Sequence, residues 1–226
     1  TCALPISSMK VDVNAQVALL IKDGSERQSM AADAKGNIFI LRSSEIIKVD
    51  AVSGLVTRFA GTADGTGCTI ADGTDPLTPG HDQIDNHLDF EILGSSSAGD
   101  SIYFRACSAV WKMNTTSRAL SKINSTTVGS NWYMGLHDKL YYYDSSIKKL
   151  MRLNLATANQ APEHIYGNGT CVGSARPSVG ADATTSATLG ELDDSCTNEF
   201  YMFANQDETK LWVGCWSGNA GCDEAI

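Results

Sequence analysis

The stretch Gly36-Asn37-Ile38-Phe39-Ile40, followed by Lys48-Val49-Asp50, decides the fold of this chain, because both phrases recur in the same order. The first phrase, a polar turn leading into an apolar strand, returns at residues 99–104, 137–142 and 208–213. The second, a basic residue, an apolar residue and then Asp or Asn, also occurs at 10–12, 112–114 and 152–154, in steps of 38, 64 and 40 residues. Two phrases in a fixed order at a similar offset indicate an internal repeat of about 40 residues.

A repeat of this length predicts the blades of a β-propeller, each an antiparallel sheet of four strands, A to D. Short apolar runs divided by Gly, Asn, Asp and Ser, without helical periodicity, favour an all-β fold. We assign whole blades to residues 28–60, 88–124 and 132–167, and half blades to 8–22 and 196–216. A closed propeller needs at least about four blades, so we expect a fragment of a larger ring. The alternative is that the two halves close into a fourth blade.

Composition and charge exclude several classes of partner. The chain has 226 residues and a formal net charge of −9 at pH 7. An acidic chain is a poor ligand for nucleic-acid phosphates or an anionic membrane surface, which argues against an RNA-binding propeller. No apolar run approaches the roughly 20 residues of a membrane-spanning helix.

The first six residues, Thr1-Cys2-Ala3-Leu4-Pro5-Ile6, are unlike the rest of the chain. They correspond to the codons ACG TGT GCT CTT CCG ATC, a string that closes a common sequencing adapter. We interpret residues 1–6 as a cloning or assembly artefact and exclude them from fold reasoning. An ordinary coil start is the alternative. On the artefact interpretation we expect the natural protein to continue upstream of Ser7.

The segment from Met30 to Gly65 resembles an NHL repeat. In that family a strand ends in Asp, a Gly-Asn turn follows, and a basic-apolar-Asp phrase precedes a Gly turn and an Ala-Gly-Thr-Gly motif. Gly36 and Gly54 stand where hairpin turns require positive φ, and Asp50 and its equivalents can accept hydrogen bonds from turn amides. The resemblance is close in the first blade and looser in the others. It implies a propeller, usually of six blades, and no particular activity.

Six cysteines remain when Cys2 is set aside. Cys68 and Cys171 lie in long loops between blades. Cys107 and Cys215 end strand B of the blade that follows each loop, 39 and 44 residues later. Because antiparallel strands alternate in direction, D–A loops and the ends of B strands lie on one face. The predicted disulfides are Cys68–Cys107, Cys171–Cys215 and Cys196–Cys222. Zinc is the rival interpretation, without a Cys-x-x-Cys pair or a His cluster to favour it.

Three sequons, at Asn114, Asn124 and Asn168, fall at predicted strand ends or loops where a glycan could sit. Together with an even number of cysteines, they favour a secreted or luminal glycoprotein.

Catalytic and metal-binding patterns are weak. The four histidines are spread over loops and different strands, so they predict no shared metal site, and we find no Gly-x-Ser-x-Gly nucleophile motif. The first long loop is acidic, but it lacks the alternating oxygen ligands of a Ca²⁺ loop. We therefore expect no cofactor and no catalytic residue, with Ca²⁺ in this loop as the alternative.

The long D–A loops, residues 62–87 and 168–194, are the candidate binding segments, because loops of this length on a rigid scaffold often carry function. Candidate binding residues in and beside them are Asp64, Asp72, Asp75, Asp82, Asp182 and Trp216. We expect a non-catalytic module that recognises protein or glycan through this disulfide-braced face. The alternative is a propeller enzyme, such as an amidating lyase, a lactonase or a strictosidine-synthase-like protein, with its catalytic residues in other blades.

Overall fold

The computed structural model describes residues 29–42, 45–61, 70, 73, 91–126, 128, 132–169 and 200–215. Every regular element in this part of the chain is a β-strand, as the short apolar runs predict. None of these residues belongs to a helix long and apolar enough to cross a membrane. The predicted half blade at 8–22 lies outside the described residues.

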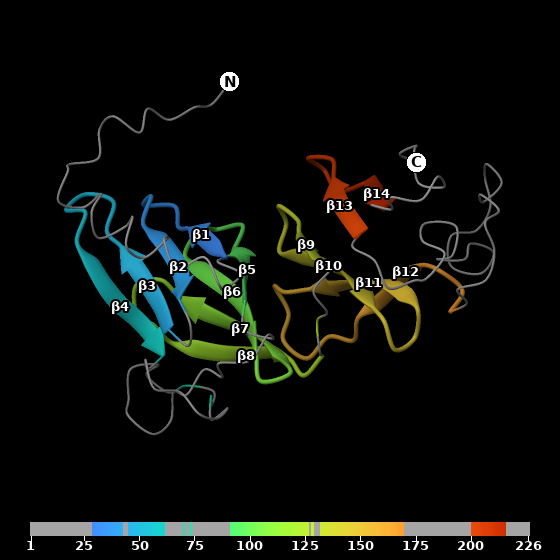
Figure 1. The fold of residues 1–226 in the computed structure, drawn as a ribbon, viewed down its shortest axis with the longest axis horizontal. Helices are drawn as coiled ribbons and strands as arrows, with labels where there is room; N and C mark the ends of the chain where they lie inside the picture. Colours follow the sequence, from blue (N-terminus) through green and yellow to red (C-terminus); the bar gives the residue numbers. More distant parts are fainter. Residues whose placement is uncertain are drawn as a thin grey trace. The chain divides into compact units, whose positions relative to one another are not determined.

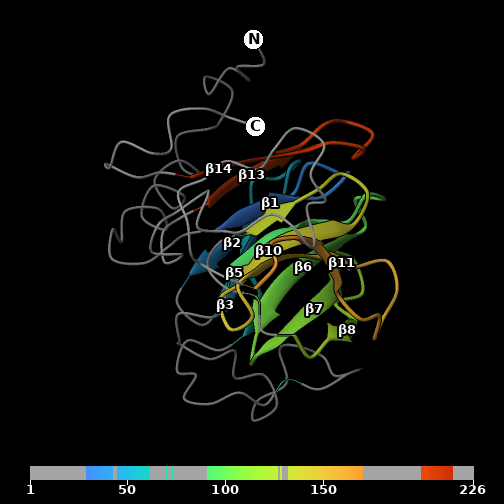
Figure 2. The same ribbon diagram turned by 90° about the vertical axis from the view of Figure 1, so that its right-hand side faces the viewer.

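The strands form three four-stranded antiparallel sheets and one hairpin, each in simple sequence order (Figure 1). The first sheet contains β1 (Met30–Ala32), β2 (Ile38–Arg42), β3 (Glu45–Val49) and β4 (Val56–Gly61). The second contains β5 (Glu91–Ser95), β6 (Ser101–Ala106), β7 (Ala109–Asn114) and β8 (Leu120–Asn124). The third contains β9 (Trp132–Met134), β10 (Lys139–Asp144), β11 (Lys149–Asn154) and β12 (Glu163–Tyr166). The hairpin consists of β13 (Phe200–Ala204) and β14 (Leu211–Cys215), seen lengthwise in red in Figure 2.

The three sheets and the hairpin lie where the repeated phrases occur in the sequence, whereas the predicted blade bounds stay predictions. In the third sheet the first strand ends at Met134. The turn that follows, residues 135–138, is closed by Gly135 N donating to Lys139 O at 2.8 Å.

The chain divides into two compact units, and the boundary crosses the second sheet. One unit is Thr1–Cys107 with Trp111–Lys122, and the other is Ser108–Val110 with Ile123–Ile226. Within the first unit β1 contacts β5, and within the second β9 contacts β13. Consecutive antiparallel sheets that pack through their first strands are blades of a β-propeller.

The basic-apolar-Asx phrase ends the third strand of each complete sheet and shapes the turn that follows. Asp50 Oδ1 accepts hydrogen bonds from Val52 N at 3.2 Å and Ser53 N at 2.9 Å. Asn114 Oδ1 does the same for the amides of Thr116 and Ser117, at 2.9 and 2.8 Å. These are Asx turns, in which a short side chain satisfies turn amides that the ladder leaves unpaired. The predicted role of this position is confirmed.

The turn between the first two strands of each sheet also follows one pattern. Its fourth residue has positive φ in every case: +80° at Gly36, +67° at Gly99, +56° at Asp138 and +52° at Glu208. Glycine adopts this conformation without strain, whereas Asp and Glu do so at a cost. The two non-glycine residues therefore need compensating contacts.

Candidate functional site

The predicted cysteine face is described at one well-defined point, the turn between β6 and β7. Cys107 and Ser108 form this turn with φ values of +56° and +54°, the tight geometry that twisted hairpins favour. Cys107 is disulfide-bonded, and its partner is not among the side chains that the structure describes. The pairing with Cys68 therefore stays a prediction.

Most other predicted site residues cannot be placed. Cys215 ends β14, but its side chain is not among those described. The following predicted residues lie outside the described part of the chain: Cys68, Cys171, Cys196, Cys222, Asp64, Asp72, Asp75, Asp82, Asp182 and Trp216. No group of three or more His, Cys, Asp or Glu residues that could hold a metal ion occurs among the residues that the structure describes.

The three sequon asparagines are described, and each is partly exposed at or just beyond the end of a strand. Asn114 uses its side-chain oxygen for the Asx turn described above. Asn124 donates from Nδ2 to the carbonyl oxygen of Gln160 at 2.6 Å. A glycan is attached through Nδ2, so of these two contacts only the one made by Asn124 involves the atom that a glycan would modify.

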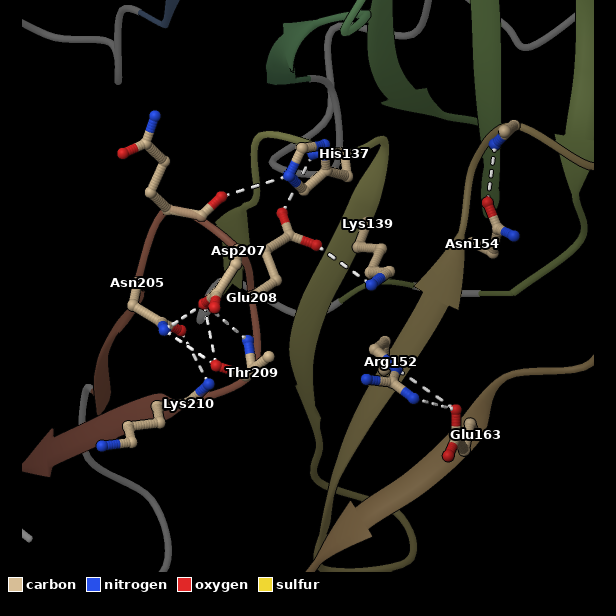
Figure 3. A network of polar contacts seen from close by, with 12 residues as sticks. His137, Lys139, Arg152, Asn154, Glu163, Asn205, Asp207, Glu208, Thr209 and Lys210 are labelled. Carbon is tan, nitrogen blue, oxygen red and sulfur yellow. Dashed lines mark hydrogen bonds and ion pairs between the residues drawn. The ribbon is translucent and has the colours of Figure 1, made fainter.

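A network of polar contacts lies at the end of the sheets where strands A and B are joined, which is opposite to the end that carries the Cys107 turn. It is the best-defined polar cluster of the second unit (Figure 3). At its centre is Glu208, in the turn between β13 and β14, whose side chain is 0% exposed. Its Oε1 accepts a hydrogen bond from His137 N at 3.0 Å. Its Oε2 lies 3.3 Å from Lys139 Nζ. The carboxylate thus joins the hairpin to the β9–β10 turn of the third sheet.

The first sheet shows what Glu208 replaces. There, Asp33 begins the β1–β2 turn, and its Oδ1 accepts from Lys35 N at 3.0 Å and Asn37 N at 2.9 Å. The equivalent of Asp33 in the third sheet is Gly135, which has no side chain to do this. A Cβ atom at Gly135 would overlap Glu208 Oε1. The missing carboxylate of one turn is therefore supplied by the next blade.

The rest of the hairpin turn is held by its own residues. Asn205 Oδ1 accepts from Lys210 N at 2.7 Å, and Asp207 Oδ1 accepts from Thr209 Oγ1 at 2.8 Å. The Thr209 hydroxyl and amide lower the pKa of the Asp207 carboxyl. His137 lies beside this turn, with Nε2 3.1 Å from the carbonyl oxygen of Gln206. His137 thus lies in the turn between β9 and β10.

Burial in the third sheet raises the pKa values of two tyrosines of β10, Tyr141 and Tyr142. Desolvation, with the charge of Glu208 as the next cause, raises the pKa of Tyr141. Desolvation and nearby Asp144 raise the pKa of Tyr142 to about 12. On the outer strands, Glu163 raises the pKa of Arg152 by accepting its hydrogen bonds. These groups stay in one charge state near neutral pH.

Chemically, the network serves to hold one blade on the next. The Glu208 carboxylate is buried, contacts a turn amide and an ammonium group, and faces Gly135 at close range. Sequence reasoning missed this contact, because it joins residues about 70 positions apart. A signal does exist: glycine stands at 135 where the other turns have Asp33, Ser96 and Asn205, and glutamate stands at 208 where two turns have glycine.

No protein-family model matches the sequence, and no curated protein is a significant match to it. Solved structures with a similar fold are β-propeller proteins. A chain of a mitotic checkpoint complex is 10% identical, with a TM-score of 0.42 over 88% of this chain and 50% of that one. The PQQ-bound aldose sugar dehydrogenase from Streptomyces coelicolor is 13% identical, with a TM-score of 0.38 over 88% of this chain and 79% of that one.

The chain thus spans half the length of the checkpoint-complex chain that it matches. Such similarities concern fold and say nothing about activity. The sheets themselves show that the chain is an all-β protein built from the four-stranded antiparallel blades of a partial β-propeller.

Proposed function

We propose that this protein is a non-catalytic binding or scaffold module, an NHL-type propeller that works outside the cytosol. Its ligand is a protein or a glycan, held by the loops at the Cys107 end of the blades. The observation that carries the proposal is the disulfide at Cys107, in the turn between β6 and β7. Disulfides persist mainly in oxidising compartments.

The geometry of the blades favours this end for binding. At the other end, the turn amides are satisfied by Asx side chains and by Glu208, so these turns are suited to holding the blades together. At the Cys107 end, a disulfide ties a tight turn to a second cysteine of the chain. Restraining a loop before binding lowers the entropy that binding must overcome.

The sequons favour the same compartment. Asn114, Asn124 and Asn168 are all partly exposed, so a glycan attached at any of them can extend into solvent. A glycan at Asn114 leaves its Asx turn intact, because that turn uses Oδ1. The acidic charge of the chain favours neutral or cationic ligand surfaces.

The proposal is tested by expressing the chain in a secretory host and mapping its disulfides under non-reducing conditions. We expect a Cys68–Cys107 peptide and a mass loss on enzymatic removal of N-glycans. The oxidised protein is then applied to a glycan array and to a panel of extracellular protein domains. We expect binding to a probe that is lost in Cys107→Ser and in a variant with Asp72, Asp75 and Asp82 changed to Asn.

The matched control is Val52→Ser in the β3–β4 turn, at the opposite end of the blade. Val52 is 96% exposed, so this change should leave both fold and binding unaltered. Free thiol at Cys107, binding to no probe of either kind, or equal loss of binding in the control would contradict the proposal.

A further inference from the structure

Two of the three sequons, residues 114–116 and 124–126, are described in full, and their side chains are used in different ways. Asn114 ends β7 and Asn124 ends β8, whereas the sequon of Asn168 extends beyond the described residues. A sugar is attached to the asparagine at Nδ2, and recognition of the sequon needs the hydroxyl group two residues later. Whether a sequon can carry a glycan in the folded protein therefore depends on what the fold does with these two groups.

At the second sequon both groups make contacts that hold the fold together. Asn124 Nδ2 donates to Gln160 O at 2.6 Å, and the Thr126 hydroxyl donates to Asn124 Oδ1. A backbone hydrogen bond between the neighbouring residues, from Asn159 N to Ile123 O, is also 2.6 Å long. Together these bonds fasten the end of β8 to the segment between β11 and β12.

The hydroxyl of this sequon also contacts a buried tyrosine of β10. Tyr142 is 1% exposed. Burial and the charge of Asp144 raise its pKa to about 12, and a hydrogen bond with the Thr126 side chain opposes that rise. A buried phenol group needs such a partner, because an unpaired hydroxyl would lose its hydration without compensation. Thr126 thus connects Asn124 to the third sheet.

At the first sequon the fold uses the other atom of the asparagine amide. Asn114 Oδ1 accepts from the amides of Thr116 and Ser117 and from Ser117 Oγ, the last at 3.1 Å. Nδ2 takes no part in these bonds. The middle residue anchors the turn, since the amide and the hydroxyl of Thr115 both donate to Asp100 O, at 2.8 and 3.0 Å. Substitution of Nδ2 therefore leaves the bonds of this turn intact.

The hydroxyl of the first sequon lies at the surface. Thr116 is exposed, as is Lys35, whose Nζ donates to Thr116 Oγ1 at 3.3 Å. An exposed hydrogen bond exchanges with water at little net cost, so this contact does not withdraw the hydroxyl from solvent. The first sequon thus combines a fixed turn with two groups that the fold can spare.

From this contrast we infer that Asn114 carries an N-linked glycan, whereas the Asn124 sequon stays without one because its two groups stabilise the fold. The inference rests on the secreted location proposed above. In the transfer, Nδ2 bonds to C1 of a sugar supplied by a lipid-linked oligosaccharide diphosphate, the bond from C1 to the diphosphate oxygen breaks, and Nδ2 loses one proton. A sugar on Asn124 Nδ2 would lie beside Gln160, so the contact there would have to open.

Two substitutions of the sequon hydroxyls should give opposite results. Thr116→Ala removes the first sequon but keeps the backbone amide that Asn114 accepts from, so it should abolish one glycan and leave stability unchanged. Thr126→Val removes the second sequon together with its contacts, so it should leave the number of glycans unchanged and lower the urea midpoint of unfolding. Thr126→Ser, which keeps the hydroxyl, is the matched control and should resemble the wild type in both measurements.

Glycans are mapped by mass spectrometry of peptides from the full chain expressed in a secretory host. We expect a glycan on the Asn114 peptide and an unmodified Asn124 peptide. Stability is measured on the same chains made in a bacterial periplasm, where disulfides form, so that sugars do not affect the comparison.

The possible failures are distinguishable. A glycan on Asn124 of the folded protein, an unmodified Asn114 beside a glycosylated Asn168, or an unchanged urea midpoint in Thr126→Val would overturn this inference alone. A chain without a glycan on any of the three asparagines would overturn it together with the glycoprotein part of the proposed function. The disulfide map and the ligand panel described above then decide whether the rest of that proposal stands.

Discussion

At the scale of single residues, Glu208 shows how a repeat position can change its chemistry and remain compatible with the fold. Positive φ at this residue is unfavourable for a side chain larger than glycine. The carboxylate offsets that cost by accepting from His137 N and pairing with Lys139. Gly135 is the necessary counterpart, because only a residue without Cβ leaves room for Oε1.

Changing this pair should destabilise the second unit in a predictable order. Glu208→Ala leaves the part-buried amide of His137 without its acceptor and the Lys139 ammonium group without its counter-charge, and we expect a loss of about 1.5–3 kcal/mol. Glu208→Gln keeps an acceptor and should lose about 1 kcal/mol. Gly135→Ala should lose about 1–3 kcal/mol, because its methyl group overlaps the carboxylate. Urea unfolding followed by tryptophan fluorescence measures each effect.

The double variant Gly135→Asp with Glu208→Gly is the decisive control, because it copies the arrangement of Asp33 and Gly99. It should be more stable than either single change. If the two effects simply add, the two residues are not coupled in the way described.

At the scale of elements, the turn after the third strand is built by one side chain at the end of the basic-apolar-Asx phrase. Hydrogen bonds from Ser53, first from its amide and then from its hydroxyl, lower the pKa of the Asp50 carboxyl. Asn154 builds the equivalent turn in the third sheet with a neutral oxygen, which accepts from Ala156 N at 3.0 Å. The turn needs an acceptor, and the negative charge strengthens it.

This difference predicts a pH dependence. Because the pKa of Asp50 is lower in the folded than in the unfolded chain, its charge stabilises the fold above the unfolded pKa, and this contribution is lost as pH falls through the folded pKa. Asp50→Asn should therefore be less stable than the wild type at pH 7, with the gap closing below the ordinary value of 3.8. Unfolding midpoints in urea across this range give the measurement.

Asn154→Asp is the reciprocal control, since it introduces a charge at the same repeat position and should gain acid-sensitive stability. A gap between wild type and Asp50→Asn that is constant with pH would show that the charge of Asp50 is without effect.

At the scale of the whole molecule, the net charge of −9 and the sequence pI of about 4.8 limit the partners of the protein. Polyanions are repelled by an acidic surface, and salt screens this repulsion. We expect the protein to pass through a heparin column at low ionic strength and to be retained by an anion exchanger. Retention on heparin that salt reverses would reveal a basic surface and reopen nucleic acid as a ligand.

The local sequence was enough to predict the strands, their order and the chemistry of the turns. Gly36 at a positive-φ position and Asp50 at an Asx turn are dictated by contacts within a few residues, so short phrases carry the information. The repeat of those phrases also predicted sheets of four strands in sequence order, because each blade is one antiparallel meander.

The contacts between blades could not be obtained in this way. Glu208 meets Gly135, and Met202 joins Tyr141 in one cluster, only because two sheets stack face to face. No local sequence pattern around Glu208 or Met202 indicates which face of a sheet packs against which neighbouring sheet. Turns are governed by local backbone geometry and hydrogen bonding, whereas the burial of Tyr141 depends on the second sheet that covers it.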